Sequence, residues 1–104
     1  MLFDQGVPTP LRSSLPGHEV ITAYDLGWST LSNGELLRAA EMAGFQVLVT
    51  TDQNLRYQQN LSDRNIAVLV LATTSWPRIH AAAGSVAAAI ETAALGAYTL
   101  LPIP

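Results

Sequence analysis

Short apolar segments typical of β-strands alternate along this chain with segments of helical spacing. Strands that alternate with helices form a parallel sheet, and right-handed crossovers place the helices on both of its faces. The pattern therefore predicts an α/β fold, a three-layer α/β/α sandwich around a mostly parallel sheet of about five strands. The expected strands cover residues 1–4, 19–24, 45–50, 66–71 and 97–101. The expected helices cover 9–16, 32–44 and 75–94, and a short polar helix or turn is expected over 54–61.

The composition fits one small folded domain that spans residues 1–104. Of the 104 residues 49% are hydrophobic and only 12% are charged, so the chain can bury a core. The absence of cysteine excludes disulfides, thiol catalysis and thiolate metal sites. Because Asp4 and Pro8 interrupt the first apolar residues, we expect no signal sequence and a cytoplasmic protein.

The most apolar stretch, residues 79–101, is expected to be a buried amphipathic helix followed by a strand. It contains Gly84, Glu91 and Gly96 and is rich in alanine, so it does not have the composition of a membrane span. We therefore expect no association with membranes.

The charge balance bears on nucleic-acid binding. The formal net charge is −3, and the positive side chains are five arginines with no lysine. Proteins that hold nucleic acid by nonspecific phosphate attraction are normally basic, which argues against that mode here. A nuclease remains compatible with this balance because a bound divalent cation changes the local field.

Two of the predicted strands end in an aspartate at a turn. Asp4 follows the first strand and Asp52 follows the third. The carboxyl ends of parallel strands open on one edge of a sheet, where ligands bind, so these carboxylates should meet in space. Converging carboxylates are a hard-oxygen site for Mg²⁺ or Mn²⁺.

Each acidic candidate also has a purely structural interpretation. Asp4 can form an Asx turn with its own backbone, and Asp52 can cap a following helix. Glu35 stands three residues after Ser32, which is the spacing of a capping box, although a helix start at this edge is also where a third metal ligand would lie. Asp25 follows the second strand and is either a site residue or a solvated loop residue.

Polar residues after the third strand are candidates for positioning a substrate. Asn54 can bind a phosphate oxygen or shape a turn, and Arg56 lies close enough to Asp52 to touch a phosphate or else is solvated. Trp28 can stack on a base or pack on the neighbouring helix. The sequence contains no glycine-rich phosphate loop and no nucleophile elbow.

Several segments of the chain resemble the short bacterial PIN-like domains, which are small relatives of PIN ribonucleases. Some members of that group are proposed to be toxins of toxin–antitoxin pairs. The resemblance covers about residues 1–71, and the Thr-x-Asp-x-Asn portion is its most specific part. The segments that carry it are Asp4-Gln5-Gly6-Val7-Pro8, Gly27-Trp28, Asn33-Gly34-Glu35-Leu36-Leu37, Val49-Thr50-Thr51-Asp52-Gln53-Asn54-Leu55 and Arg56-Tyr57-Gln58-Gln59-Asn60-Leu61.

The resemblance implies a PIN-like sandwich with an acidic pocket that binds Mg²⁺ or Mn²⁺. By position, Asp4 would be the first-strand acid, Glu35 the helix-start acid and Asp52 the third acid. The chain departs from the pattern at Gln5 and Asn54, where relatives usually carry acids. These departures argue against two-metal catalysis and leave hydrolysis with one metal ion.

Three functions are consistent with this interpretation. The first is a metal-dependent ribonuclease in which Asp4, Glu35 and Asp52 hold the ion and catalyse hydrolysis, while Asn54, Arg56 and more weakly Asp25 position RNA. The second is a degenerate, non-catalytic PIN-like module that binds a protein partner. The third is a nucleotide or phosphate-ester binder without hydrolysis.

The alanine-rich helix predicts association with another protein. Ile79, Ala83, Val86 and Ile90 suffice to cover the sheet, which leaves an outer face with few charges that includes Ala81, Ala88 and Leu95. We therefore expect a homodimer or a complex with a small, antitoxin-like protein. Alternatively, the alanines reflect helix propensity on a solvated face.

Overall fold

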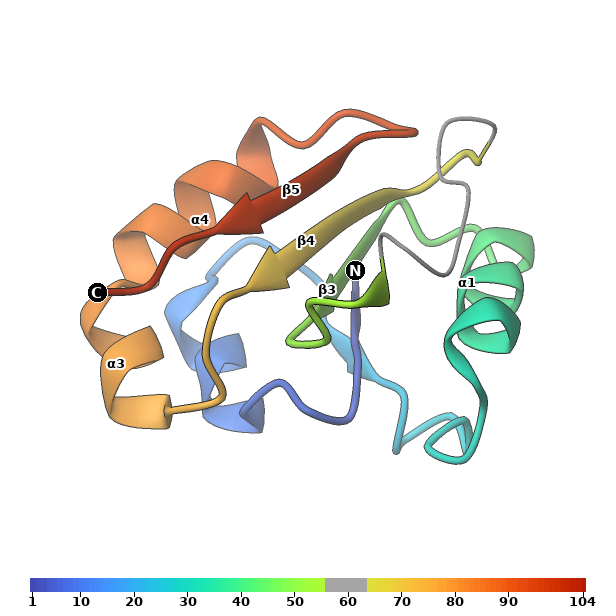
Figure 1. Cartoon of the computed structure of the whole chain (residues 1–104), viewed down its shortest axis with the longest axis horizontal. Coiled ribbons are helices and arrows are strands. Elements are labelled where there is room, and N and C mark those ends of the chain that lie inside the picture. Colours follow the sequence, from blue (N-terminus) through green and yellow to red (C-terminus); the bar gives the residue numbers. More distant parts are fainter. Residues whose placement is uncertain (56–63) are drawn as a thin grey trace.

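The computed structural model describes residues 1–55 and 64–104 and shows a five-stranded sheet (Figure 1). All neighbouring strands are parallel, and they lie in the order β2-β1-β3-β4-β5. The predicted α/β class and parallel sheet are thus confirmed. The strands are β1 (Leu2–Phe3), β2 (Ile21–Thr22), β3 (Val47–Thr50), β4 (Ala67–Leu71) and β5 (Tyr98–Leu101).

Helices cover both faces of the sheet. In Figure 1, α1 lies on one side of the strands, and α3 and α4 lie with the 3₁₀ helix η1 on the other. This arrangement is the predicted three-layer α/β/α sandwich. The helices within the described residues are η1 (Thr9–Ser14), α1 (Asn33–Met42), α3 (Trp76–Ala81) and α4 (Ala83–Glu91).

The core is divided by the sheet into two clusters because successive strand residues point to opposite faces. Leu2, Leu48 and Val68 belong to the cluster under α1. Phe3 and Val49, their direct neighbours in sequence, belong to the cluster under η1, α3 and α4, as does Leu69. Strands buried on both faces are continuous apolar segments in the sequence, which is why β4 has no polar residue.

Three predicted elements differ from the structure. The second strand, expected over residues 19–24, is limited to Ile21–Thr22, and the helix expected over 9–16 is a 3₁₀ helix that ends at Ser14. The helix expected over 75–94 is two helices. Its break is at Ala82, where φ is −102°, ψ is 14° and the N–H donates to both the Arg78 and Ile79 carbonyls.

Most of the helix expected over residues 54–61 lies outside the described residues, as does Arg56. The helix α1 begins after Ser32 and ends before Gly44, as predicted. Gly44 adopts a φ of 86°, the left-handed conformation that favours glycine at a helix C-terminus.

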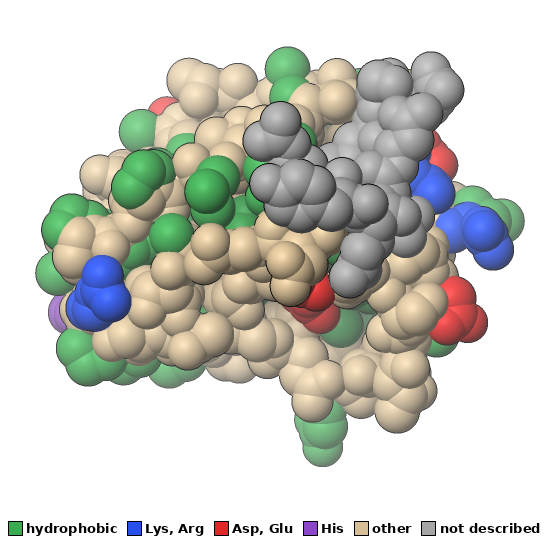
Figure 2. Space-filling view, viewed as in Figure 1, with side chains coloured by type: hydrophobic (Ala, Val, Ile, Leu, Met, Phe, Trp, Pro, Cys, Tyr) green, Lys and Arg blue, Asp and Glu red, His purple; other side chains and the backbone are tan. Residues whose placement is uncertain are grey.

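The outer face of the alanine-rich region is exposed, as the sequence suggested. Ala81 and Ala88 are exposed and Leu95 is 55% exposed. Figure 2 shows hydrophobic side chains gathered over the part of the molecule formed by α3, α4 and β5. Within residues 1–55 and 64–104, no helix has the length and apolar character needed to cross a membrane. The homodimer stays a prediction.

Candidate functional site

The candidate site lies where the chain order of the sheet reverses. From β1 the chain continues to β2 on one side, while β3 pairs with β1 on the other. In open α/β sheets ligands bind beside the carboxyl ends of the strands at such a switch point. We call this side of the sheet, which carries Asp4, Asp25 and Asp52, the carboxyl edge.

The register of β1 and β3 sets which residues meet there. Leu2 pairs with Leu48 and Phe3 pairs with Val49, so the residue after β1 lies alongside the last residue of β3. Those two residues are Asp4 and Thr50. The Asp4 N–H donates to the Val49 carbonyl at 2.9 Å, which extends the pairing beyond the strand.

The hydroxyl of Thr50 connects the two aspartates. Thr50 is fully buried, and its Oγ1 donates to Oδ2 of Asp4 at 2.7 Å. The same oxygen accepts the backbone N–H of Asp52 at 3.1 Å. The structure therefore brings the Asp4 carboxylate and the Asp52 backbone N–H to one buried hydroxyl. That the two carboxylates share an ion stays a prediction.

The remaining hydrogen bonds hold both carboxylates in place. Oδ1 of Asp4 accepts the Gln5 N–H at 2.7 Å. Oδ2 of Asp52 accepts the side-chain amide of Asn33 at 2.6 Å, and Oδ1 accepts the Asn54 N–H at 2.9 Å. A carboxylate offers about four lone-pair sites, so each group keeps acceptor capacity. Hydrogen-bonded carboxylates with free lone pairs suit a hard divalent cation.

Gly6 allows the turn after β1 to lie against the turn after β3. A Cβ at this position would collide with the hydroxyl of Thr51. The Val7 N–H donates to the Asp4 carbonyl at 3.0 Å and closes the turn that contains Gly6. Any larger residue at position 6 would require the Thr51 side chain to shift.

Glu35 forms the capping box in this structure. Its Oε1 accepts the Ser32 N–H at 3.1 Å, while the Ser32 hydroxyl accepts the Glu35 N–H at 3.3 Å. The donated backbone N–H, and next the Ser32 side chain, lower the pKa of Glu35. The residue of α1 that contacts the Asp52 carboxylate is Asn33, whose side-chain amide donates a hydrogen bond to it. Across residues 1–55 and 64–104, no three His, Asp or Glu side chains are grouped as a metal site.

The other predicted site residues lie around this pair. Asp25 is exposed, and its N–H donates to the Thr22 hydroxyl at 3.1 Å. Asp25 and Asp4 line one cavity of about 380 Å³, the carboxyl-edge cavity. Asn54 is exposed and contributes its backbone N–H to Asp52. Trp28 packs edge-on against Phe45 at 6.4 Å between ring centroids, in the cluster under α1.

Thr50 and Asn33 were not predicted as site residues. Thr50 offers one signal, since it is a hydroxyl residue at the end of an otherwise apolar strand and two residues before Asp52. Asn33 lies next to a capping serine, where polar residues need no further explanation. Their roles depend on the register of β1 with β3 and on the position of α1, which single residues do not reveal.

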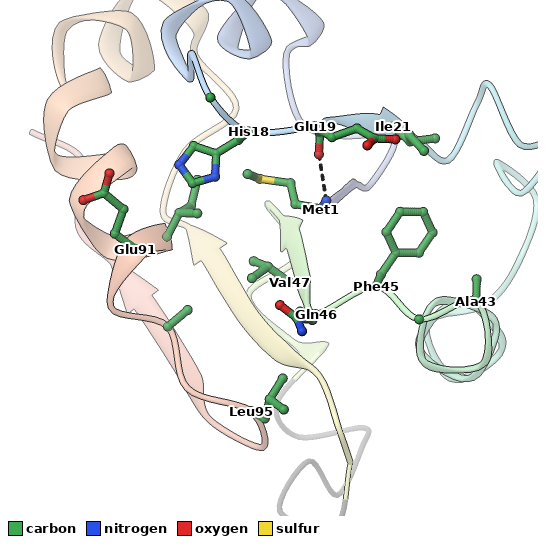
Figure 3. A pocket seen from close by; sticks show the side chains of 14 residues that line it. Met1, His18, Glu19, Ile21, Ala43, Phe45, Gln46, Val47, Glu91 and Leu95 are labelled. Atoms are coloured by element: carbon green, nitrogen blue, oxygen red, sulfur yellow. Dashed lines mark hydrogen bonds between the residues drawn. The ribbon is translucent and has the colours of Figure 1, made fainter.

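A larger cavity of about 860 Å³ opens at the other side of the sheet, beside the amino ends of the strands, which we call the amino edge. Figure 3 shows Met1, Glu19 and Ile21 on one side of it, Phe45 and Ala43 on another, and His18 near Glu91. Of the site residues predicted from the sequence, none that the structure describes lines this amino-edge cavity. The larger of the two cavities is therefore not the one that carries the predicted site residues.

Comparison with known proteins assigns no family to this geometry. The chain matches no family model, no curated protein and no solved structure. The chemistry that this protein can perform is therefore argued from the side chains at the carboxyl edge.

Proposed function

We propose that the protein is a Mg²⁺- or Mn²⁺-dependent phosphodiesterase that acts on RNA. The observation that carries this proposal is that the Thr50 hydroxyl joins the Asp4 carboxylate to the backbone N–H of Asp52. Two hydrogen-bonded carboxylates at the β1–β3 switch point match the needs of Mg²⁺, which commonly binds one or two carboxylates and keeps several waters.

Each residue of the pair has a defined part in the proposed site. Asp4 and Asp52 would hold the ion through the lone pairs that their hydrogen bonds leave free. Asn33 fixes the orientation of the Asp52 carboxylate through the 2.6 Å hydrogen bond. When bound, the ion supplies a nucleophilic water and neutralises charge on the phosphate. Asn54 and Arg56 keep their proposed roles in positioning the phosphate.

The surface charge bears on the choice of substrate. The net charge is −3, and on the face shown in Figure 2 the positive side chains lie at opposite ends of the molecule, with acidic side chains beside those at one end, and form no continuous basic patch. Attraction to phosphates must then come mainly from the ion and from local contacts. This favours a short stretch of single-stranded RNA over a duplex held along its backbone.

A second candidate function is a non-catalytic PIN-like module that acts through a protein partner in the cytoplasm. One observation favours it. The described residues include no three-acid group, and Gln5 and Asn54 stand where relatives usually carry acids. In a toxin–antitoxin setting the partner would be a small protein or a second copy of the chain.

Cleavage of labelled single-stranded RNA tests the proposed function. We expect purified protein to cut a mixed-sequence oligoribonucleotide when Mn²⁺ is present and not in EDTA. The Asp52→Asn variant should cut about 100-fold more slowly, because loss of a charged ligand should cost at least as much as loss of a supporting residue. Glu91→Gln, at the amino edge, is the matched control and should retain activity.

Two outcomes would reject the ribonuclease. Equal cleavage by wild type and Asp52→Asn would assign the activity to a contaminant or to another site. No cleavage of any RNA pool with Mg²⁺ or Mn²⁺ would leave the non-catalytic module as the better interpretation.

A further inference from the structure

The carboxyl-edge cavity carries residues that the proposed hydrolysis does not use. Asp4 and Asp25 form one part of its lining, and Arg12 from η1 and Tyr24 from the segment after β2 form another. A cavity that combines a guanidinium, an aromatic ring and carboxylates has the groups that a nucleotide needs. Its volume of about 380 Å³ lies at the small end of the range for ligand sites, about 300–1,000 Å³.

Arg12 is one of two arginines, with Arg38, that form no ion pair or side-chain hydrogen bond within residues 1–55 and 64–104. Arg64 forms an ion pair with Glu41, and Arg78 donates to the carbonyls of Ile103 and Pro104. Arg12 is exposed and forms no ion pair or side-chain hydrogen bond with any residue that the structure describes. Its guanidinium keeps all of its donors for a ligand such as a phosphate, which it can bind through two parallel hydrogen bonds.

Tyr24 presents its ring to solvent at the same cavity. Its side chain is 76% exposed, which is the second-highest value among the large hydrophobic residues that are exposed. The backbone around it is fixed, because its carbonyl accepts the Gly27 N–H at 3.1 Å and the Ala23 N–H before it donates to Phe3 at 2.9 Å. An exposed aromatic ring on a fixed backbone is a platform on which a base can stack.

We propose that the carboxyl-edge cavity binds one nucleotide of a single-stranded RNA, with the phosphate on Arg12 and the base stacked on Tyr24. The proposal rests on the proposed function, since Asp4 belongs both to this cavity and to the pair joined by Thr50. The neighbouring phosphodiester would then lie at Asp4 and Asp52. A paired base is not free to stack on Tyr24, so duplex RNA should bind poorly.

Binding can be measured without cleavage. We would titrate protein into a fluorescein-labelled single-stranded oligoribonucleotide of about five nucleotides, in EDTA and low salt, and follow fluorescence anisotropy. We expect Arg12→Gln to weaken binding about 10-fold and to reduce the slope of log K against log salt by about 0.7. Tyr24→Ala should weaken binding about 10-fold, whereas Tyr24→Phe should stay within about twofold because the stacking face remains.

Arg38→Gln is the matched control for Arg12→Gln. Arg38 is also exposed and has no ion pair or side-chain hydrogen bond with the described residues, but it lies in α1 and does not line the cavity. It should leave both the affinity and the salt slope within error of wild type. Equal losses in Arg12→Gln and Arg38→Gln would overturn the proposal, as would the absence of binding by wild type at millimolar protein.

The result separates this inference from the proposed hydrolysis. If the oligonucleotide binds through Arg12 and Tyr24 but no metal ion supports cleavage, the nucleotide site stands and the ribonuclease fails. If RNA is cut but neither variant weakens binding or raises KM, the ribonuclease stands and the nucleotide site is wrong. A duplex of the same sequence that binds as tightly as the single strand would also reject stacking on Tyr24.

Discussion

The carboxyl and amino edges of the sheet carry cavities of different size and different chemistry. The amino-edge cavity is larger, about 860 Å³ against about 380 Å³. Its acidic residues, Glu19 and Glu91, come from a loop and from the end of α4, and the hydrogen bond drawn in Figure 3 runs from the Met1 amino group to the Glu19 carbonyl. At the carboxyl edge, side chains from β3 and α1 bond directly to Asp4 and Asp52.

This difference shows what marks a site in a small α/β domain. Cavity volume favours the amino edge, but connected side chains that fix two carboxylates occur at the carboxyl edge. These hydrogen bonds hold the two aspartates in one arrangement, and a preorganised arrangement is what binding an ion requires. Matched substitutions at the two edges can test whether the carboxyl edge has this property.

The largest stability effect is expected for Thr50→Val. Valine fits the space of threonine but leaves Oδ2 of Asp4 and the N–H of Asp52 without their shared partner. Because Thr50 is fully buried, the free energy of unfolding should fall by about 2 kcal/mol. Urea denaturation of wild type and variant measures the change.

The reverse substitution at the amino edge, Val47→Thr, is the control for Thr50→Val. Val47 begins β3, is half-buried and lines the amino-edge cavity. A hydroxyl there can reach water, so the loss should stay below about 1 kcal/mol. If the two variants lose the same stability, Thr50 acts only as a packing residue and the comparison between the edges fails.

The next effect concerns metal ions. If Asp4 and Asp52 bind Mn²⁺ in the folded state only, a concentration ten times Kd should stabilise the protein by about 1.4 kcal/mol. For a domain of this size, that corresponds to a rise in Tm of roughly 5–10 °C. Asp4→Asn should remove the rise, and Glu19→Gln at the amino edge should keep it.

A thermal melt at increasing Mn²⁺ gives the answer in one series. A rise of equal size in Asp4→Asn would place the ion elsewhere. If the Tm of wild type does not rise at millimolar Mn²⁺, Asp4 and Asp52 do not bind the ion and serve only the structure.

The sequence predicted the location of Asp4 and Asp52 because connectivity alone brings the ends of parallel strands together. It did not predict Thr50 as their link, since that depends on the pairing of Phe3 with Val49. The position of Arg12 depends on how η1 packs against the sheet, and that of Tyr24 depends on the pairing of β2 with β1. The break at Ala82 lies two residues before the Gly84-Ser85 pair, and such pairs are common sites of helix kinks.

The capping box of α1 can be predicted completely from the sequence. Ser32 and Glu35 are three residues apart in one chain segment, so their contact needs no tertiary information. The sequence could not decide whether Glu35 is also a metal ligand. In the structure Oε1 of Glu35 faces the Ser32 N–H, and the last prediction separates the two roles.

Glu35→Gln is expected to have the smallest effect. Glutamine also completes a capping box, so the substitution removes the charge and keeps the hydrogen bond to Ser32. If Glu35 serves only the cap, the rise in Tm with Mn²⁺ should equal that of wild type, and RNA cleavage should persist. A smaller rise would restore Glu35 as the third ligand that the resemblance implies, with Glu91→Gln as the control for loss of one negative charge.

The pH dependence of stability tests the capping role of Glu35 independently of metal binding. Hydrogen bonds from Ser32, with a smaller contribution from the Arg38 charge, lower the pKa of Glu35 below its ordinary value of 4.5. A carboxylate with a lowered pKa in the folded state adds stability above its unfolded pKa, and this stability is lost as pH falls through the folded pKa. Wild type should therefore exceed Glu35→Gln in stability above pH 4.5, and the difference should vanish in more acidic solution. Metal-free melts of both proteins from pH 3 to pH 7 measure it, and a difference that grows toward low pH would contradict the capping role.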